Sequence, residues 1–544
     1  MATETTNDTI TAYLPDVETP QASRDAMQWA LDEFRGSRQG TYFGFYKYIE
    51  GDQPLAFATE KFKSAFGRSF DAFRANRLVG VVGAITDRLS IVGWGGDDDG
   101  EEAQDAKDLW DENDMQEREL QVYDEAATAG DAYAIVEKHP DTGEVHIWPQ
   151  TAVQCRVHYS QDRPGEVEYG VRQWVESDRY ARLNIYFGDR IEKYRSNSAM
   201  PDGTDLRDWA RETNAASLAG RFLPYQPEGD SAWPVMLPGD GTTVPVFHFA
   251  ANGTVNSYGI SELENLIPVQ DAFNKTLMDL LVAMEFAAFP QRYLLNADTA
   301  GSREAIKRYQ AGVERLINIK AAIDDSGVTL PVGAGEFSAA DVQQYIDPIE
   351  LFDRLISRLS KVPEHYLRGD EGSDQMSGRS RRLKEAPFVA KLEKYQKKFG
   401  PVWLRLMIYA LSLEGKQADR KSLRVIWRPA APMAKEDLLD VAMVEKTLGL
   451  SLRTILRETM GLDKEQIDTY LEEITEEQDE KAARFNAGLG PGLSPFGPAP
   501  GQPATGPRPA QGQPGQKPPA PDLRVRQQDR TDPRREQRQA RSTA

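Results

Sequence analysis

The most regular hydrophobic pattern in the chain lies in residues 257–293. Apolar side chains, with one glutamine among them, recur there at steps of three and four, the spacing of a helix that packs lengthwise against its neighbours. The positions of this seam are Leu263, Leu266, Gln270, Phe273, Leu277, Leu280 and Met284. Pro268 has no backbone N–H, so we expect the main helix to begin or bend there. On this pattern alone, a core helix of an ordinary enzyme is the favoured interpretation.

Polar residues that fall off the seam are expected to face water. They are Asp271, Asn274, Lys275 and Asp279.

Two later stretches repeat the same helical spacing. In residues 342–359 the apolar positions are Val342, Tyr345, Ile349, Phe352, Ile356 and Leu359, and in residues 382–413 they are Phe388, Leu392, Tyr395, Phe399, Trp403, Leu406 and Ala410. Pro387 and Pro401 are expected to bend the last of these helices. A small mixed insert, residues 291–340, separates the first helix from the second, and one helix is expected within it at 302–317. A polar, glycine-containing loop, residues 367–380, separates the second from the third.

The first half of the chain predicts helices followed by an antiparallel sheet. Helical spacing covers residues 22–38, 59–73, 76–89, 103–112 and 115–129. The aromatic and glycine-rich stretch 40–55 predicts turns, and the acidic stretch 93–102 predicts a loop. Period-two patterns with turn residues between them then predict one meander with strands at 131–138, 144–148, 153–159, 166–176, 181–187 and 190–194. Another strand is expected at 244–249, a short one at 425–428, and compact helices at 435–480, so the expected fold class is α+β.

Charge is distributed unevenly along the chain. The 544 residues carry a net charge of −20. Residues 481–544 hold 11 basic and 4 acidic residues, a net +7, which leaves 54 basic and 81 acidic residues, a net −27, in residues 1–480. A body this acidic repels phosphate, which argues against a nuclease, polymerase or repressor that clamps duplex DNA. It does not exclude a protein past which DNA slides.

The cysteine content, the apolar runs and the composition of the C-terminal segment narrow the class of protein further. The single cysteine, Cys155, excludes an intrachain disulfide and a multi-cysteine metal site. There is no N-terminal signal and no apolar run long enough for a membrane span. Residues 485–522 are rich in Pro, Gly, Ala and Gln and are expected to be disordered. Residues 523–544 hold seven arginines, which could bind DNA or an acidic partner, or only keep the chain soluble.

Motifs of catalysis are missing from the sequence. It contains no GxxxxGK[ST], HExxH or GxSxG pattern, and the five histidines show no metal-ligand spacing. The acidic run around Asp97–Asp99 resembles half of a calcium loop, but Gly100 stands in the wrong place for an EF-hand. We therefore expect no enzyme activity, no catalytic residue, no cofactor and no metal. An enzyme of an unrecognised class stays as an alternative.

The order of these parts and several separated segments resemble the portal proteins of tailed bacteriophages, most closely those of long-tailed phages of actinobacteria. The resemblance covers about residues 42–480. It rests on Tyr48–Leu55, NRLVGVVGAITDRLSIVGW, NSYGISELENLIPVQDAFNKTLMDLLVAMEFAAFPQRY, KVPEHYLRGD and RRLKEAPFVAKLEKYQKKFGPVW. Another ring or scaffold component of the virion is the nearest alternative, and a DNA-binding module resting on the arginine tail is a further one.

The resemblance implies a multi-domain portal architecture: a wing of helices and antiparallel sheet, a helical stem, a small α/β clip, a long bent helix and a helical crown. Its implied parts are the wing 1–257 (with 1–22 mobile), a stem helix 258–289, the clip 290–340, a second stem helix 341–362, the tunnel loop 363–382, the long wing helix and strand 383–434, the crown 435–480 and a disordered tail 481–544.

The implied function is a ring, typically of twelve subunits, at one vertex of the capsid in the virion. Such a ring is assembled in the host cytoplasm and is the channel through which the terminase packages double-stranded DNA and through which the DNA is later ejected. It is also the attachment site for head-completion and tail proteins. The implied partners are other copies of the chain, double-stranded DNA, the large terminase subunit, head-completion or adaptor proteins, the major capsid protein and scaffold, with no membrane.

Two sets of residues become candidates on this basis. The tunnel-loop and channel set is Arg368, Asp370, Glu371, Asp374, Arg379, Arg381, Arg382 and Lys384. The stem oligomer-interface set is Leu263, Leu266, Phe273, Leu277, Leu280, Met284, Tyr345, Ile349, Phe352 and Ile356. The loop arginines could touch DNA phosphates transiently, or they could form ordinary salt bridges at the start of the third helix. A charge placed at Phe273 or Leu277 is expected to block ring assembly more than it unfolds the wing.

Overall fold

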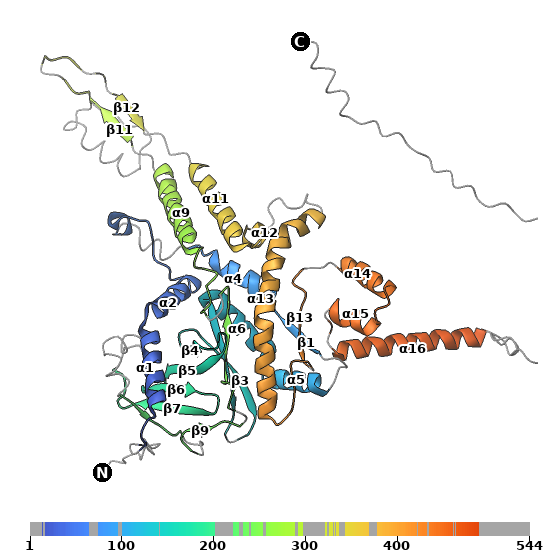
Figure 1. The fold of residues 1–544 in the computed structure, drawn as a ribbon. Coiled ribbons are helices and arrows are strands. Elements are labelled where there is room, and N and C mark those ends of the chain that lie inside the picture. Colours follow the sequence, from blue (N-terminus) through green and yellow to red (C-terminus); the bar gives the residue numbers. More distant parts are fainter. Residues whose placement is uncertain are drawn as a thin grey trace, which may run out of the picture. The chain divides into compact units, whose positions relative to one another are not determined.

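The fold is described from a computed structural model (Figure 1). It describes residues 14 and 17–488, except for 65–73, 96–100, 141, 202–220, 228–231, 239–240, 254–256, 289–291, 297–320, 324–325, 330, 332, 337–342, 369–377, 422, 432–434, 461 and 463. The chain divides into a large unit, Met1–Glu472, and a small one, Glu473–Ala544. Of the small unit, only helical residues up to Gly488 are described.

Five helices form most of the first part of the large unit. They are α1 (Gln21–Arg35), α2 (Ser37–Ile49), α4 (Leu78–Thr86), α5 (Glu101–Glu112) and α6 (Met115–Ala129). The predictions at 76–89, 103–112 and 115–129 are confirmed. Of the helix predicted at 59–73, residues 60–64 are helical and residues 65–73 lie outside the described part.

The predicted turns at 40–55 are wrong over most of their length, because α2 is a helix that begins one residue after Gly36 ends α1. The single helix predicted at 22–38 is therefore two helices. Aromatic residues and glycine have modest helix propensity, but tertiary burial overrides it. The buried residues of α2 follow one another every three positions and are Gln39, Tyr42, Phe45 and Tyr48.

The strands predicted as one meander belong to two sheets. One sheet has the order β10 (Val246–Ala250), β2 (Asp131–Lys138), β3 (Val145–Gln150). The other has the order β4 (Cys155–Tyr159), β5 (Val167–Val175), β6 (Ala181–Tyr186), β7 (Arg190–Ser196), β8 (Phe222–Pro224), with β9 (Val235–Met236) also paired to β7. All of these pairs are antiparallel. The alternating pattern fixes which residues face inward, but it does not say which sheet a strand joins.

The edge strand β3 is closed to further pairing by side chains from the turn before α6. Asn113 Nδ2 donates to the carbonyl of Val145 (3.0 Å), and the amide of Ile147 donates to Asn113 Oδ1 (2.9 Å). Arg118 Nη1 donates to the carbonyl of Ile147 (3.1 Å). These contacts satisfy backbone groups that could otherwise pair with another strand.

A long helix, α13 (Gly378–Leu413), packs along this core and runs without interruption through Pro387 and Pro401. Trp403 on its buried face is fully covered, with ring centroids 5.2 Å from Trp110 and 4.5 Å from Phe249. After α13 the chain forms β13 (Arg424–Trp427), which pairs antiparallel with β1 (Ile91–Gly95). The loop predicted at 93–102 therefore begins with the end of a strand.

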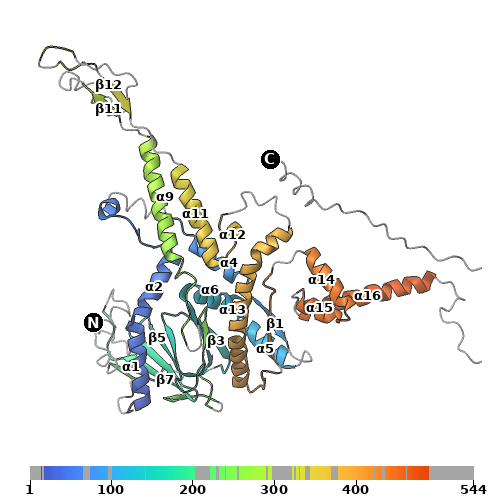
Figure 2. The ribbon, with the colours of Figure 1, turned by 45° about the horizontal axis from the view of Figure 1, so that its top comes forward.

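Helices α9 (Ile267–Ala288) and α11 (Gln343–Ser360) pack against each other, and both views show them side by side (Figures 1 and 2). The short strands β11 (Arg292–Leu295) and β12 (Gly333–Glu336) lie between α9 and α11 in the sequence, and they pair with each other. The helix predicted within the insert, at 302–317, lies outside the described residues. α12 (Glu364–Arg368) follows α11.

The last described helices are α14 (Lys435–Thr447), α15 (Leu452–Glu458) and α16 (Lys464–Gly488). Ser451 caps α15, since its hydroxyl accepts the amide of Thr454 at 3.2 Å. α16 continues to Gly488, past the boundary at residue 480 where the tail was predicted to begin. Residues 489–544 lie outside the described part.

Candidate functional site

The α9–α11 pair is fixed to the body at its base by an ion pair between a partly buried arginine and a buried carboxylate. Arg77, just before α4, holds Asp353 of α11 with both ends of its guanidinium, Nε to Oδ1 at 3.0 Å and Nη2 to Oδ2 at 3.4 Å. The same guanidinium lies over the ring of Phe273 in α9, 5.2 Å from its centroid. Asp353 and Phe273 are almost fully buried. One arginine therefore ties both helices to the body.

Polar residues of α9 add to this attachment. Gln270 accepts the amide of Arg77 (2.9 Å) and donates to the carbonyl of Ala75 (2.7 Å). Asp271 accepts the Tyr48 hydroxyl at 2.8 Å, and burial raises the pKa of Asp271. The expectation that Asp271 and Asn274 face water is wrong, because both are buried against the body.

Burial falls along the two helices away from this base. Leu263 and Leu266, which precede α9, belong to the main core together with Ile356. Phe273 and Met278 are also buried, whereas Leu277 and Leu280 are half-buried. On α11 the half-buried members of the candidate set are Tyr345, Ile349 and Phe352. Met284 is 50% exposed.

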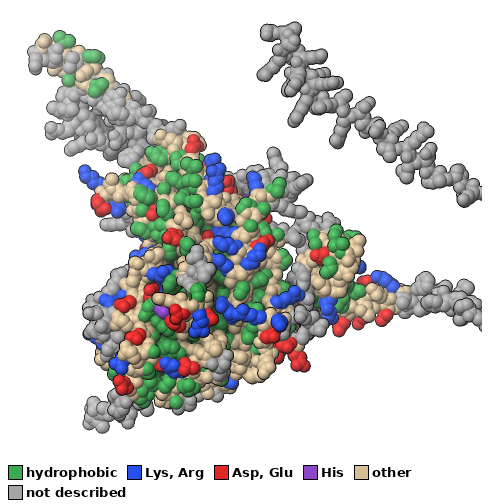
Figure 3. All heavy atoms as spheres, in the orientation of Figure 1, with side chains coloured by type: hydrophobic (Ala, Val, Ile, Leu, Met, Phe, Trp, Pro, Cys, Tyr) green, Lys and Arg blue, Asp and Glu red, His purple; other side chains and the backbone are tan. Residues whose placement is uncertain are grey.

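Large apolar side chains outside the candidate set are also exposed on these helices. They are Leu281 on α9 and Ile346, Leu351 and Leu359 on α11, exposed by 38%, 37%, 48% and 52%. Figure 3 shows hydrophobic side chains on the viewed face over α9 and α11. A helix pair that exposes this many large apolar side chains along its length is typical of a surface covered in an assembly.

A second buried ion pair joins the start of this helix pair to α13. Lys391 Nζ contacts Glu262 Oε2 at 2.6 Å and donates to the carbonyl of Ser360 at 2.7 Å. The Tyr395 hydroxyl donates to the other oxygen of Glu262 at 2.6 Å. Burial lowers the pKa of Lys391, and the charge of Glu262 opposes that effect. The end of α11, the segment before α9 and α13 thus meet at the Lys391–Glu262 pair.

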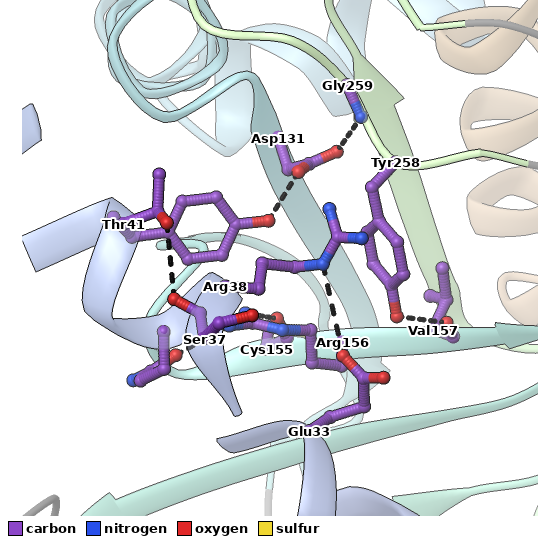
Figure 4. A network of polar contacts seen from close by, with 12 residues as sticks. Glu33, Ser37, Arg38, Thr41, Asp131, Cys155, Arg156, Val157, Tyr258 and Gly259 are labelled. Atoms are coloured by element: carbon purple, nitrogen blue, oxygen red, sulfur yellow. Dashed lines mark hydrogen bonds and ion pairs between the residues drawn. The ribbon is translucent and has the colours of Figure 1, made fainter. Parts of the chain in front are cut away.

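A third buried network holds the loop that leads to α9 (Figure 4). Asp131, at the start of β2, accepts the Tyr42 hydroxyl and the Gly259 amide, both at 2.5 Å, and contacts His248 Nε2 at 2.7 Å. Burial alone would raise the pKa of Asp131, but these hydrogen bonds and the His248 charge hold the pKa below its ordinary value. Beside it, Arg38 lies over the Tyr258 ring, 4.0 Å from the centroid.

Gly259 also shows why this loop is fixed. A Cβ on Gly259 would lie 1.8 Å from the carbonyl oxygen of Gly130, a position that no side chain can share. The backbone of the loop therefore lies directly on the start of β2, and only glycine fits there.

Three further features of the described residues bear on the kind of protein this is. In the part of the chain that the structure describes, no three His, Cys, Asp or Glu side chains lie close enough together to hold a metal ion. None of the described helices combines the length and the apolar character needed to cross a membrane. Cys155 is fully buried, and burial raises the pKa of its thiol to about 12.

Comparison with known families decides what kind of protein has this architecture. A family model described as "Phage portal protein, SPP1 Gp6-like" matches residues 92–481, well over half of the chain. The chain belongs to the phage portal protein family. Members are structural components of the phage particle rather than enzymes, and they form a ring at the head–tail junction. The α+β arrangement of helices and antiparallel sheets agrees with that architecture.

Other comparisons are less informative. A solved structure described as the neck of an empty GTA particle, computed with C6 symmetry, is 11% identical, with a TM-score of 0.41 over 75% of this chain and 95% of that chain. No curated protein matches the chain.

The tunnel-loop candidates of this portal protein fall on both sides of an undescribed segment. Arg368 is the last residue of α12, and Arg379, Arg381 and Arg382 lie in the first turns of α13. Lys384 is exposed on α13. Asp370, Glu371 and Asp374 lie outside the described residues. The loop predicted at 363–382 is thus shorter than expected, because helices occupy 364–368 and 378–382.

The ion pairs that fix the stem-like helices were missed by the sequence analysis. Arg77 and Asp353 are 276 residues apart, and Glu262 and Lys391 are 129 residues apart. No local pattern marks such partners.

Proposed function

We propose that this portal protein closes a ring of about twelve subunits around a channel for double-stranded DNA. During assembly the terminase would drive DNA inward through the channel, and the same channel would later release it. The observation that carries this proposal is the exposure of large apolar side chains along α9 and α11 in a single chain. In a closed ring, the helices of neighbouring subunits cover those side chains.

The parts of the chain receive their roles from the family likeness. We assign residues 1–257 to the wing and residues 258–289 and 341–362, which include α9 and α11, to the stem. Residues 290–340 are assigned to the clip, 363–382 to the tunnel loop, 383–434 to the long wing helix and strand, and 435–480 to the crown. The candidate tunnel-loop arginines would face the channel or pair with neighbouring subunits.

The charge of the body supports a channel rather than a clamp. The net charge of −27 in residues 1–480 disfavours tight contact with phosphates over most of the surface. DNA in such a channel meets few strong binding sites, so it can move in both directions. The arginine-rich segment 523–544 is too small to reverse this balance.

The other partners that we propose for this protein follow from its role as a portal. The clip would meet the large terminase subunit during packaging and head-completion or adaptor proteins afterwards. The wing would meet the major capsid protein and scaffold at the vertex. These contacts are proposals that rest on family membership.

Negative-stain images of the purified chain together with a mass measurement test the proposal. We expect rings with a central hole and a mass near twelve copies of the 60.8-kDa chain. A chain that stays monomeric over a wide range of concentration and salt, also when mixed with capsid protein and scaffold, would contradict it.

A further inference from the structure

The exposed side of α13 carries a row of positive charges in an otherwise acidic body. Lys394, Lys398 and Arg405 follow one another at steps of four and seven residues, so they share one face of the helix over about 16 Å. Lys394 and Arg405 are exposed, and in the described residues neither forms a hydrogen bond or an ion pair. Figure 3 shows Lys and Arg side chains gathered in the middle of the viewed face.

Two further cations extend this row. Lys361, after α11, and Arg420, before β13, are exposed and likewise have no ion pair among the described residues. Lys361 and Lys394 are close enough to Lys391 to lower its pKa beyond the effect of burial, and Arg420 acts in the same way on Arg405. We call Lys361, Lys394, Lys398, Arg405 and Arg420 the basic stripe.

Like charges held this close together are unfavourable unless negative charge is supplied from outside. Only Lys398 has a close partner, the carbonyl of Gly253 at 2.6 Å, and a carbonyl carries no net charge. Residues 1–480 carry a net charge of −27 and hold many carboxylates with which these cations could pair, yet four of the five cations are exposed. The stripe therefore has the character of a surface that another molecule neutralises.

The last turns of α5, the turn after it and the first turn of α6 have the opposite charge. Their exposed carboxylates include Asp108, Glu112, Asp114 and Glu117. The Asp108 side chain accepts only from Gln104 of its own helix (2.7 Å), and the other three have no ion pair among the described residues. We call these four residues the acidic corner.

We propose that the basic stripe of one subunit docks against the acidic corner of a second copy of this chain. This inference rests on the proposed ring. A closed ring of identical subunits needs two different and complementary surfaces on each chain, which meet head to tail. Charge complementarity selects the neighbour and its register, and it speeds the encounter more than it adds affinity.

The duplex-DNA backbone is the other polyanion that such a stripe could bind. The observations favour the neighbouring chain for two reasons. The acidic corner supplies a matching set of unpaired charges on the same molecule, and the surrounding body repels phosphate. DNA binding is therefore one of the outcomes that the test must separate.

Charge reversal on the full-length chain tests the pairing. The stripe variant carries Lys394→Glu and Arg405→Glu, and the corner variant carries Glu112→Lys and Glu117→Lys. Because each variant then presents like charges at the interface, we expect the fraction of chain in rings to fall about tenfold or more at about 0.15 M salt. The chain that carries all four substitutions restores opposite charges and is expected to form rings again.

The matched control reverses two arginines that are exposed and already paired within the chain, Arg24→Glu and Arg163→Glu. It is expected to form rings as the unaltered chain does. Circular dichroism of every variant shows whether the fold is kept, and recovery of rings by the fourfold variant excludes misfolding as the cause of the loss.

Each result has a definite meaning. If the stripe variant forms normal rings, or if the fourfold variant fails to recover them, the pairing is wrong. If the rings are normal but retain less double-stranded DNA, the stripe serves DNA and not the neighbour. If the unaltered chain forms no ring at all, the proposed function fails and this inference falls with it.

Discussion

At the scale of single residues, Glu119 is the clearest case of a group whose burial has a measurable cost. Its carboxylate accepts the Tyr123 hydroxyl (2.9 Å), the Ser90 hydroxyl (3.1 Å) and the amide of Ile91. Burial nevertheless outweighs these bonds and raises the pKa of Glu119 to about 7. The folded chain therefore holds a proton there that the unfolded chain releases near its ordinary pKa of 4.5.

Glu119→Gln is expected to flatten the dependence of stability on pH. The contribution from protonated Glu119 is fully present below about pH 4.5 and is lost as the pH rises to about 7, at an order-of-magnitude cost of about 3 kcal/mol. Urea unfolding at several pH values measures the slope. Glu117→Gln, an exposed change on the same helix, is the control and should leave the slope unchanged. Equal slopes for Glu119→Gln and the unaltered chain would contradict the assignment.

At the scale of elements, the contact between α13 and the segment before α9 depends on the pair Lys391–Glu262. Both side chains are 8% exposed, so Lys391→Met leaves a buried carboxylate without its cation. We expect a loss of about 3–5 kcal/mol in the free energy of unfolding, measured with urea. Adding Glu262→Gln should recover much of that loss, because no charge then stays buried.

Lys397→Met is the matched control for this prediction. Lys397 pairs with Glu393 on the same helix, but these side chains are 77% and 50% exposed. Its loss is expected to change stability by less than about 0.5 kcal/mol. Similar losses for Lys391→Met and Lys397→Met would show that the buried pair does not hold the elements together.

The elements differ in how well the sequence predicted them. Helices α9, α11 and α13 carry apolar side chains at steps of three and four, and their existence followed from that spacing alone. α2 was missed because its aromatic and glycine residues disfavour a helix locally and only burial stabilises it. The sheets were merged because strand alternation holds no information about partners.

The sequence predicted less of the candidate site than of the helices and strands. The apolar seam of α9 was found, but its inner half is buried within the chain, whereas its outer half is only half-buried at Leu277 and Leu280 and exposed at Met284. Asp271 was assigned to water because its partner, Tyr48, is 223 residues away in sequence. Long-range ion pairs such as Arg77–Asp353 leave no local signal, so only the folded chain reveals them.

At the scale of the whole molecule, the gradient of burial along α9 and α11 changes which substitutions test ring formation. Phe273 is 1% exposed and lies under Arg77, so a charge there would disturb the base of the helix pair within one chain. Met284 and Leu351 are 50% and 48% exposed. A charge at those positions has access to water in a single chain and loses it only when a neighbour covers the helices.

Met284→Glu combined with Leu351→Glu is therefore expected to abolish rings while the single chain keeps its fold. Burying two unpaired carboxylates at each interface costs several kcal/mol, and this cost recurs at every contact in the ring. Mass measurement with negative-stain imaging follows assembly, and circular dichroism follows the fold. Met236→Glu adds the same charge at another methionine, 65% exposed on β9, and should leave rings intact. Normal rings from the double variant would mean that α9 and α11 do not line the subunit interface. Loss of rings with Met236→Glu would mean that added charge alone opposes assembly.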